Sequence, residues 1–387
     1  MIVNFEFFDE NPIENVITSL NYKIDKTIFF GYGSVTEEQR RPVETFLLNE
    51  CGVTEVQFCT VSETNLDVVL DRISQRVHKE QEQGNHVFFD LTGGESLLLV
   101  AFGILSREFQ APMHVYDIHA NQIREFGYEG KKNLSDVAEF REIQLNLDQF
   151  ISLYGGKVNH RMHKEFKKSW KPEDRNDVEA MWKLSREFKN KWLHYSALLR
   201  KFQPDDYLFV SVDESNMLNA LRSNRSLGRP GHFHQFLDRC EALGFLTAVQ
   251  YGPEGYRWNY KNQNVKNYFW DGGSILEMYG FLLESEQDPE PSDCRVGVHI
   301  DWDGVFHREW GVDVLNEIDI MSIHNNLPTF ISCKMGSVDQ MALYELETVA
   351  ARFGGKYARK VLMVAKEVAG GHLERAKEMG IEVVWVK

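Results

Sequence analysis

Asn316-Glu317-Ile318-Asp319 ends one apolar run of this chain, and Phe330-Ile331-Ser332-Cys333-Lys334 ends the next. The segment between them, His324 to Pro328, reads as a hairpin turn. Because side chains alternate along a strand, Asp319 lies on one face of the first strand and Lys334 on one face of the second. The pattern therefore predicts two neighbouring strands that bring an Asp and a Lys together.

An acid held beside a lysine is an arrangement that metal-dependent phosphodiester hydrolysis commonly uses. The carboxylate of Asp319 would bind Mg²⁺ or Mn²⁺, and the ammonium of Lys334 would orient the attacking water and offset developing charge. A surface ion pair is the competing interpretation of the same two residues. The nuclease hypothesis therefore depends on what surrounds them in the sequence.

A second carboxylate stands upstream, in Trp270-Asp271-Gly272-Gly273-Ser274-Ile275-Leu276-Glu277. This segment leads into an apolar helix that we expect to run to about Leu283 and to bring Glu277 towards the hairpin. Ser274 and Glu277 also match the S-x-x-E capping box, which alone would explain the glutamate. Metal binding and helix capping therefore both remain open for Glu277.

The order of these elements carries more information than any one of them. Gly-Gly-x-x-x-Glu opens a helix, one strand carries Asn-Glu-Ile-Asp, and the next carries Cys-Lys before a helix from Val338 to Phe353. This order resembles the restriction-endonuclease-like (PD-D/ExK) core. The resemblance implies four catalytic positions, which are Asp319, Lys334, Glu277 and Ser332.

Ser332 departs from that family, which normally has an acid two residues before the lysine. A hydroxyl is a poorer ligand for a hard cation than a carboxylate. Either metal binding is weak, or Glu277 and the backbone carbonyl of Cys333 complete the shell around the cation. The metal ligands that we expect are therefore Asp319, Glu277 and the Cys333 carbonyl, with Mn²⁺ or Mg²⁺ as the cation.

Length and composition predict a soluble protein of two or three domains, since the chain has 387 residues, of which 43% are hydrophobic and 26% charged. No apolar run reaches membrane-spanning length, and Met1 to Glu6 does not begin a signal peptide. The five cysteines are odd in number and lack CxxC spacing, which argues against a disulfide framework or a zinc site. We therefore expect a cytoplasmic protein without a membrane partner.

The net charge of -15 argues against indiscriminate nucleic-acid binding. The charge is uneven, however, because residues 157–201 contain thirteen Lys and Arg against six Asp and Glu. Three further arginines follow, Arg222, Arg225 and Arg229. A local basic region therefore qualifies the acidic average.

The first half of the chain alternates strand and helix signals. Strand-like runs occur near residues 2–7, 27–31, 54–60, 86–91 and 113–117. Helical patterns lie between them, near residues 12–20, 36–49, 64–80 and 95–109. This alternation predicts an open, mostly parallel, doubly wound sheet, whose ligands bind beyond the carboxyl ends of the strands.

Asp90-Leu91-Thr92-Gly93-Gly94-Glu95-Ser96 lies at one such strand end. The loop lacks a Walker lysine, and Gly31-Tyr32-Gly33-Ser34-Val35-Thr36 stops short of GxGxxG, so an enzyme that uses a nucleotide cofactor has no fingerprint here. Steric demand at a strand-to-helix turn is the alternative explanation for the glycines.

The same loop resembles the CARF domain of CRISPR-associated proteins, which bind cyclic oligoadenylates across a homodimer. The family commonly has Thr or Ser and Lys after the glycines, where this chain has Glu95 and Ser96. The resemblance implies ligand contacts from the glycine loop, from the opposing loop after the second strand and from the end of the first strand: Thr92, Gly93, Gly94, Gly31, Tyr32, Gly33 and Asp9.

The middle of the chain has a different pattern. We expect a long amphipathic helix over about residues 174–202, followed by helices at Asn216 to Arg222 and His232 to Leu243. Two strand-like runs, 244–251 and 256–260, then flank a Gly-Pro-Glu-Gly turn. Helices followed by such a two-stranded wing predict a winged-helix module, which binds DNA or serves as a spacer or dimer element.

The predicted architecture is α/β throughout: a Rossmann-like CARF domain at residues 1–155, a winged-helix-like module at 156–265 and a PD-D/ExK-like nuclease domain at 266–387. This order resembles the type III CRISPR ancillary nucleases of antiviral defence. The family implies a homodimer that binds cyclic tetra-adenylate at the CARF interface, moves its nuclease domains and cuts DNA, RNA or both with Mn²⁺ or Mg²⁺. The alternative is a ligand-sensing transcription regulator with a degenerate nuclease domain, for which Ser332 is the best sign.

Overall fold

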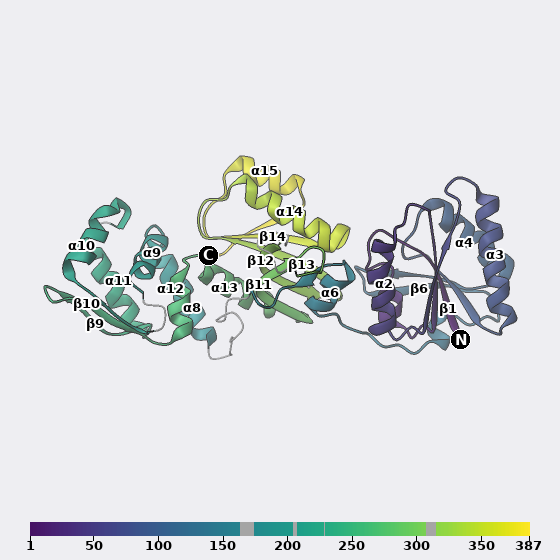
Figure 1. Cartoon of the computed structure of the whole chain (residues 1–387), viewed down its shortest axis with the longest axis horizontal. Helices are drawn as coiled ribbons and strands as arrows, with labels where there is room; N and C mark the ends of the chain where they lie inside the picture. Colours follow the sequence, from purple (N-terminus) through teal and green to yellow (C-terminus); the bar gives the residue numbers. More distant parts are fainter. Residues whose placement is uncertain (163–173, 204–206, 228, 307–314) are drawn as a thin grey trace.

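The computed structural model of the chain describes residues 1–162, 174–203, 207–227, 229–306 and 315–387. Three units lie in a row, with the C-terminal sheet in the middle, the N-terminal sheet on one side and the winged-helix module on the other (Figure 1). The order in space therefore differs from the order along the chain. No helix among the described residues has the length and apolarity needed to cross a membrane.

The N-terminal sheet has six strands in the order β3-β2-β1-β4-β5-β6. The first five are parallel to one another, and β6 pairs antiparallel with β5. Their bounds agree with the predicted strands to within a residue, apart from β6, which we did not predict: β1 (Ile2–Phe7), β2 (Lys26–Gly31), β3 (Glu55–Thr60), β4 (His86–Asp90), β5 (Met113–Asp117) and β6 (Gln122–Phe126). The doubly wound, mostly parallel sheet is thus confirmed.

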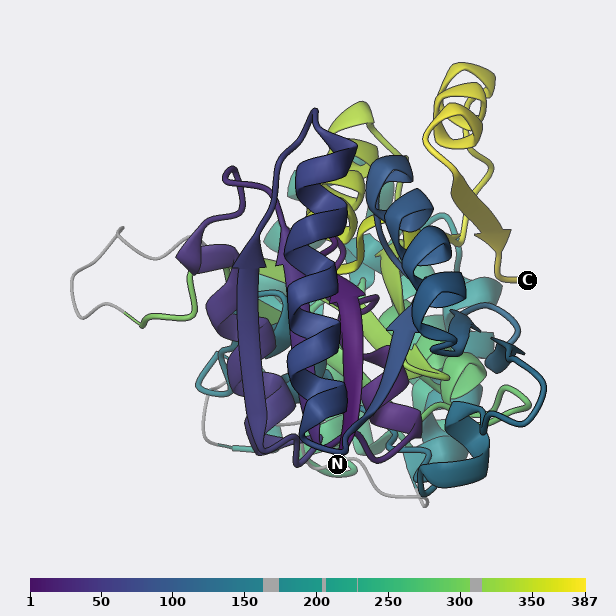
Figure 2. The same ribbon diagram turned by 90° about the vertical axis from the view of Figure 1, so that its right-hand side faces the viewer.

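Helices cover both faces of this sheet. On the inner face, towards the C-terminal sheet, lie α1 (Ile17–Asn21) and α2 (Glu37–Asn49), whereas α3 (Leu66–Glu82) and α4 (Ser96–Phe109) lie side by side on the outer face (Figures 1 and 2). α2 starts with a capping box in which Thr36 accepts from the Gln39 backbone. The predicted helix at residues 12–20 is shorter than expected, because only its second half is α-helical.

The C-terminal sheet also has six strands, in the order β15-β14-β13-β12-β11-β7. The pairs β13–β14 and β14–β15 are parallel, and the other three are antiparallel. The bounds are β7 (Lys157–Val158), β11 (Asp293–Asp301), β12 (Leu315–His324), β13 (Leu327–Lys334), β14 (Arg359–Val364) and β15 (Ile381–Trp385). Because β7 precedes the winged-helix module along the chain, that module is inserted within this unit.

Four helices complete the C-terminal unit. α6 (Leu147–Leu153) precedes β7, α13 (Ser274–Ser285) precedes β11, α14 (Gln340–Gly354) joins β13 to β14, and α15 (Gly370–Glu378) joins β14 to β15. The short α5 (Leu134–Val137) lies before them, in the linker from the N-terminal sheet. The predicted helix from Val338 to Phe353 corresponds to α14, whose first turn is capped by Asp339.

The predicted hairpin is present, with one correction. Asn325 and Asn326 form its turn with positive φ angles of 49° and 64°, which suits a tight connection between twisted strands. Asp319, however, does not end its strand: β12 continues to His324, because a fully buried run at residues 320–323 follows the acid. Asp319 and Lys334 therefore lie at the open end of the hairpin, remote from its turn.

The winged-helix module is built from α8 (Asp174–Glu187), α9 (Trp192–Phe202), β8 (Phe209–Val212), α10 (Glu214–Ser223), η1 (Arg225–Leu227), α11 (Pro230–Ala242), β9 (Leu246–Gly252) and β10 (Gly255–Tyr260), and α12 (Gln263–Trp270) leads back to α13. Its small sheet has the order β8-β10-β9. The expected single helix over residues 174–202 is wrong. The chain breaks after α8 because Phe188 and Trp192 both turn into the aromatic core around Phe236.

One hydrophobic cluster joins the N-terminal and C-terminal sheets. It contains Val43 and Phe46 of α2, Ile151 of α6 and Phe353 of α14, all buried. A second cluster lies between the C-terminal sheet and the winged-helix module. The units therefore meet through buried apolar side chains, which gives a change in one unit a packed path to the next.

Candidate active site and ligand loops

Asp319 lies where β12 and β13 separate. The backbone pairing of the two strands runs from His324–Leu327 to Ile320–Ile331. Beyond it, the Asp319 carboxylate takes the place of a strand partner: its Oδ2 accepts from the Cys333 backbone N at 2.6 Å and from the Ser332 hydroxyl at 3.3 Å. The structure thus brings three of the predicted residues, Asp319, Ser332 and Cys333, into direct contact.

Lys334 and the Cys333 carbonyl belong to the same end of β13. In a regular strand the N–H and C=O of one residue turn to the same neighbour, so the Cys333 carbonyl turns to the side where Asp319 lies. Lys334 shares a face of β13 with Ser332, because alternate side chains point the same way, and it is half-buried. Its backbone is held on the other side, where its carbonyl accepts from Ala365 at 3.2 Å.

Glu277 occupies the first turn of α13 and is buried. The capping-box interpretation is wrong, because Gly273 is the N-cap and Ser274 is the first helical residue, so Glu277 stands one position beyond the place that the motif requires. Asp271 stabilises the helix start instead, as its Oδ1 accepts from Gly273 N at 3.0 Å. The glutamate is therefore not explained by capping.

α13 packs along β12. Further along the helix, Glu284 accepts a hydrogen bond of 2.6 Å from Ser322, and a Cβ on Gly280 would lie 2.8 Å from Ile320 Cδ1. Four residues of a helix span about 6 Å, and two residues of a strand span about the same distance. Each further four residues of α13 therefore lie beside two further residues of β12. Three more helical residues, about 4.5 Å, lead from Gly280 back to Glu277, in the direction in which β12 leads back to Asp319.

The donor set suits a hard divalent cation. Asp319 lies at one end of the hairpin with the Ser332 hydroxyl, and the carboxylate, the hydroxyl and the Cys333 carbonyl are all oxygen ligands. Within the described residues, no group of three His, Cys, Asp or Glu side chains is placed to hold a metal ion.

The predicted ligand loops meet at the switch point of the N-terminal sheet. The chain winds from β1 to β2 and β3 on one side and returns to β4 on the other side of β1, so a crevice opens beyond the ends of β1 and β4. Asp9, after β1, spans this crevice, and its Oδ2 accepts from Gly94 N at 3.1 Å. A Cβ on Gly93 would lie 2.9 Å from Asp9 Cβ, so the glycine permits this close approach.

Thr92 is held from inside the protein. Its backbone N donates to Asp90 Oδ1 at 2.8 Å, its hydroxyl donates to the same oxygen, and that hydroxyl accepts from Tyr116 N at 2.9 Å. Burial opposes the charge of Asp90, yet the nearby His114 ring and a hydrogen bond from Glu6 hold the pKa of Asp90 well below its ordinary value. Thr92 therefore fixes the loop, and its hydroxyl is already engaged.

The opposing loop places its three predicted residues differently. Gly31 is buried, and a Cβ there would lie 2.6 Å from the Phe58 ring, so packing explains this glycine. Tyr32 is also buried, and burial together with the nearby Glu95 raises the pKa of its hydroxyl to about 12. Gly33 is exposed, with open space where a Cβ would stand. Only Gly33 of the three therefore presents its backbone to solvent.

A polar connection that the sequence did not reveal links the ligand loops to the C-terminal unit. Glu14, before α1, accepts from the Tyr357 hydroxyl and pairs with Lys356. Burial raises the pKa of Glu14 to about 7, the adjacent Asp9 carboxyl adds to the rise, and Tyr357 and Lys356 oppose it. No local pattern could predict this contact, because 343 positions separate Glu14 from Tyr357.

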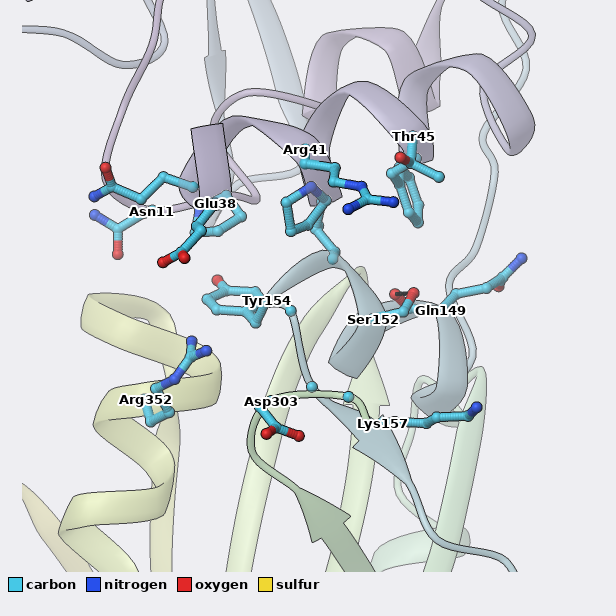
Figure 3. A pocket seen from close by; sticks show the side chains of 18 of the residues that line it. Asn11, Glu38, Arg41, Thr45, Gln149, Ser152, Tyr154, Lys157, Asp303 and Arg352 are labelled. Atoms are coloured by element: carbon cyan, nitrogen blue, oxygen red, sulfur yellow. Dashed lines mark hydrogen bonds between the residues drawn. The ribbon is translucent and has the colours of Figure 1, made fainter. Parts of the chain in front are cut away.

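A groove of about 1250 Å³ lies between the two sheets on this side. Figure 3 shows Glu38 and Arg41 from α2 above it, with Tyr154, Asp303 and Arg352 from the C-terminal unit below. Asp9 also lines it, so the groove borders the ligand loops. Its walls belong to different units, and it would therefore change shape if the units moved.

No family model matches the sequence, and no curated protein matches it. Among solved structures, the fold is similar to that of protein VC1899 from Vibrio cholerae, with a TM-score of 0.73, 15% identity and coverage of 99% of this chain and 94% of the other. It is also similar to Can2 from Sulfobacillus thermosulfidooxidans in complex with cyclic tetra-adenylate, with a TM-score of 0.67, 14% identity and coverage of 99% and 95%. The chain thus shares its fold with these two proteins over nearly its whole length.

Proposed function

We propose that this protein is a nuclease that a cyclic oligoadenylate, of which cyclic tetra-adenylate fits best, switches on in type III CRISPR antiviral defence. The observation that carries the proposal is the cluster at the open end of the β12–β13 hairpin. There Asp319 contacts Ser332 and Cys333, and the buried Glu277 belongs to the first turn of α13, which packs along β12. Phosphodiester hydrolysis in the PD-D/ExK manner needs such a set of oxygen ligands beside a lysine.

Each residue of the cluster has a role in this proposal. Asp319, Glu277 and the Cys333 carbonyl would hold Mn²⁺ or Mg²⁺, which supplies Lewis-acid stabilisation of the charge that develops on the phosphate. Lys334 would orient the attacking water and neutralise the remaining charge. Ser332 would position the Asp319 carboxylate through the hydrogen bond that its hydroxyl donates.

The ligand would lie across a homodimer at the crevice between β1 and β4. α4 starts at the glycine loop and exposes Val100 and Ile104, by 52% and 42%, on the outer face of the sheet, and an apolar stripe of this kind suits a second copy of the chain. The solved structure of Can2, which shares the fold, contains cyclic tetra-adenylate. This likeness supports the choice of ligand class.

Labelled single-stranded and duplex DNA and RNA, incubated with the purified protein with and without cyclic tetra-adenylate and Mn²⁺, test the proposal. We expect cleavage only when both are present. A sequence-specific footprint on duplex DNA without cleavage would favour the regulator instead, for which the serine at position 332 is the supporting observation.

A further inference from the structure

A basic surface lies on the winged-helix module, where the starts of α9 and α11 meet η1. It consists of Lys191, Arg222, Arg225, Arg229 and His232. The Lys191 ammonium lies 2.9 Å from His232 Nδ1, which joins the start of α9 to the first turn of α11. The arginines stand at the end of α10, in η1 and at the N-cap of α11.

Arg222, Arg225 and Arg229 are exposed, and none of them forms an ion pair with any residue that the structure describes. Elsewhere in the module, Arg239 pairs with Glu187 and Lys261 with Asp177. In a chain with 58 acidic and 43 basic residues, three unpaired arginines on one surface indicate an anionic partner.

The start of α11 adds to this charge. Its first turn contains no acid, and a Cβ on the exposed Gly231 would meet nothing within 4 Å, so an anion can approach the Gly231 backbone at the positive end of the helix dipole. The second half of the helix differs. Asp238 accepts from the Tyr251 hydroxyl at 3.0 Å, and Glu241 accepts from Val249 N at 3.0 Å. These acids would repel the phosphates that flank a DNA groove.

The basic surface lies beside the start of the helix that carries Glu277. Trp192, next to Lys191, donates to the Gly272 carbonyl at 2.8 Å, and a Cβ on Gly272 would lie 2.7 Å from the Leu193 side chain. α13 begins directly after this contact (Figure 1). A strand of nucleic acid held on the surface would therefore run towards the candidate active site.

We propose that this basic surface binds the sugar-phosphate backbone of the nucleic-acid substrate without reading its sequence, and so holds the substrate at the hairpin. The proposal rests on the nuclease function proposed above. Backbone contacts from arginines position a nucleic acid, whereas base contacts specify it. Here the arginines lie at the end of α10, in η1 and at the N-cap of α11, and the acids of the second half of α11 disfavour insertion into a groove.

The test compares two variants, each of which loses three positive charges. R222Q/R225Q/R229Q removes the arginines of the surface, and R72Q/K131Q/K132Q removes three exposed cations of the N-terminal unit that have no ion pair among the described residues. Binding is measured with labelled 30-mer DNA and RNA of two unrelated sequences, over a series of salt concentrations, in an Asp319→Asn background without metal.

We expect only the surface variant to bind more weakly. The slope of its log K against log salt should be smaller by about two to three, because each lost phosphate contact contributes about 0.9 on duplex and 0.7 on single strands. With Asp319 intact, its KM should rise while kcat is kept. Equal slopes in both variants, or weakened binding of one sequence only, would overturn the proposal. Cleavage with an unchanged KM would refute this proposal alone, and salt-dependent binding without any cleavage would refute only the nuclease function.

Discussion

Lys356 Nζ lies 2.9 Å from Glu14 Oε1 and forms an ion pair between the C-terminal unit and the N-terminal unit. The same carboxyl group accepts a hydrogen bond from the Tyr357 hydroxyl and lies beside Asp9. Asp9 in turn accepts a hydrogen bond from the backbone N of Gly94. A movement of the glycine loop therefore reaches the start of β14 through side chains in direct contact. This is the contiguous polar path along which an activator could bias the nuclease sheet.

Glu14→Ala should weaken activation. Its loss leaves Asp9 and Tyr357 without their shared partner, so the ligand loop and the C-terminal unit should respond less to one another. We expect the ratio of cleavage with and without cyclic tetra-adenylate to fall several-fold. Glu10→Ala is the matched control, since Glu10 is exposed on the same loop. An unchanged ratio in Glu14→Ala would exclude this path.

The raised pKa of Glu14 predicts a pH effect on stability. The pKa of Glu14 is about 7 in the folded protein, against an ordinary 4.5. The folded state therefore binds the proton more tightly than the unfolded state does, and stability falls as the pH rises from 4.5 to 7. The contribution is on the order of 3 kcal/mol at 1.36 kcal/mol for each pKa unit. Denaturant unfolding at pH 5 and pH 7.5 should show a smaller fall for Glu14→Gln than for the wild type.

Asp319→Asn and Lys334→Ala should each reduce cleavage by at least about 10²-fold, since one removes a metal ligand and the other removes the charge that orients water. Asparagine is preferred to alanine at position 319 because its amide oxygen can still accept from Cys333 N. Binding of cyclic tetra-adenylate, measured by calorimetry, should be kept in both. Full activity in either variant would move the active site elsewhere.

The sequence predicted most of this fold because its strands carry their own signals. β4 is nearly all apolar, β12 has an apolar run past Asp319, and the Asn-Asn turn fixes the hairpin. The errors arose where contacts between distant segments decide. β7 has only two residues and exists because Asp301 pairs with Lys157. The break between α8 and α9 follows from burial of aromatic side chains, which helix propensity does not include.

In the candidate site, too, local sequence signals predicted some features, and contacts between distant segments decided the others. The hairpin motif located Asp319 on its strand, because two paired strands need only local signals, whereas the contact of Asp319 with Ser332 came from the structure. The level of Glu277 depends on how α13 packs on β12, and the choice between capping and a buried role therefore needed the structure. The path from Asp9 through Glu14 to Lys356 joins three segments, of which the sequence indicated only the first.

Ser332→Glu tests whether the serine limits metal binding. The Ser332 hydroxyl lies 3.3 Å from Asp319 Oδ2, so a longer acidic side chain from position 332 would reach the same cation. We expect half-maximal cleavage at about tenfold lower Mn²⁺ concentration. Ser332→Gln, which has the length of glutamate without its charge, is the control. An identical metal titration in all three proteins would place position 332 outside the coordination sphere.

The last prediction concerns the glycine loop. Thr92→Ala removes a hydroxyl that donates to the buried Asp90 and accepts from Tyr116 N, whereas Thr92→Ser keeps both bonds. Gly93→Val would drive a side chain into Asp9, 2.9 Å from its Cβ, and separate the two sides of the crevice. Both Thr92→Ala and Gly93→Val should raise the half-maximal concentration of cyclic tetra-adenylate, and Thr92→Ser should not.

At saturating activator, the Thr92 and Gly93 variants should cleave as the wild type does, because the proposed metal ligands lie in another unit. A symmetric ligand activates only by binding the competent dimer more tightly than the resting one, so weaker binding raises the dose without changing the chemistry. An activator titration at fixed Mn²⁺ separates this shift from a loss of chemistry. If Thr92→Ala and Gly93→Val respond as the wild type does, the crevice between β1 and β4 does not bind the activator. If the wild type itself ignores cyclic tetra-adenylate, the N-terminal sheet binds another ligand.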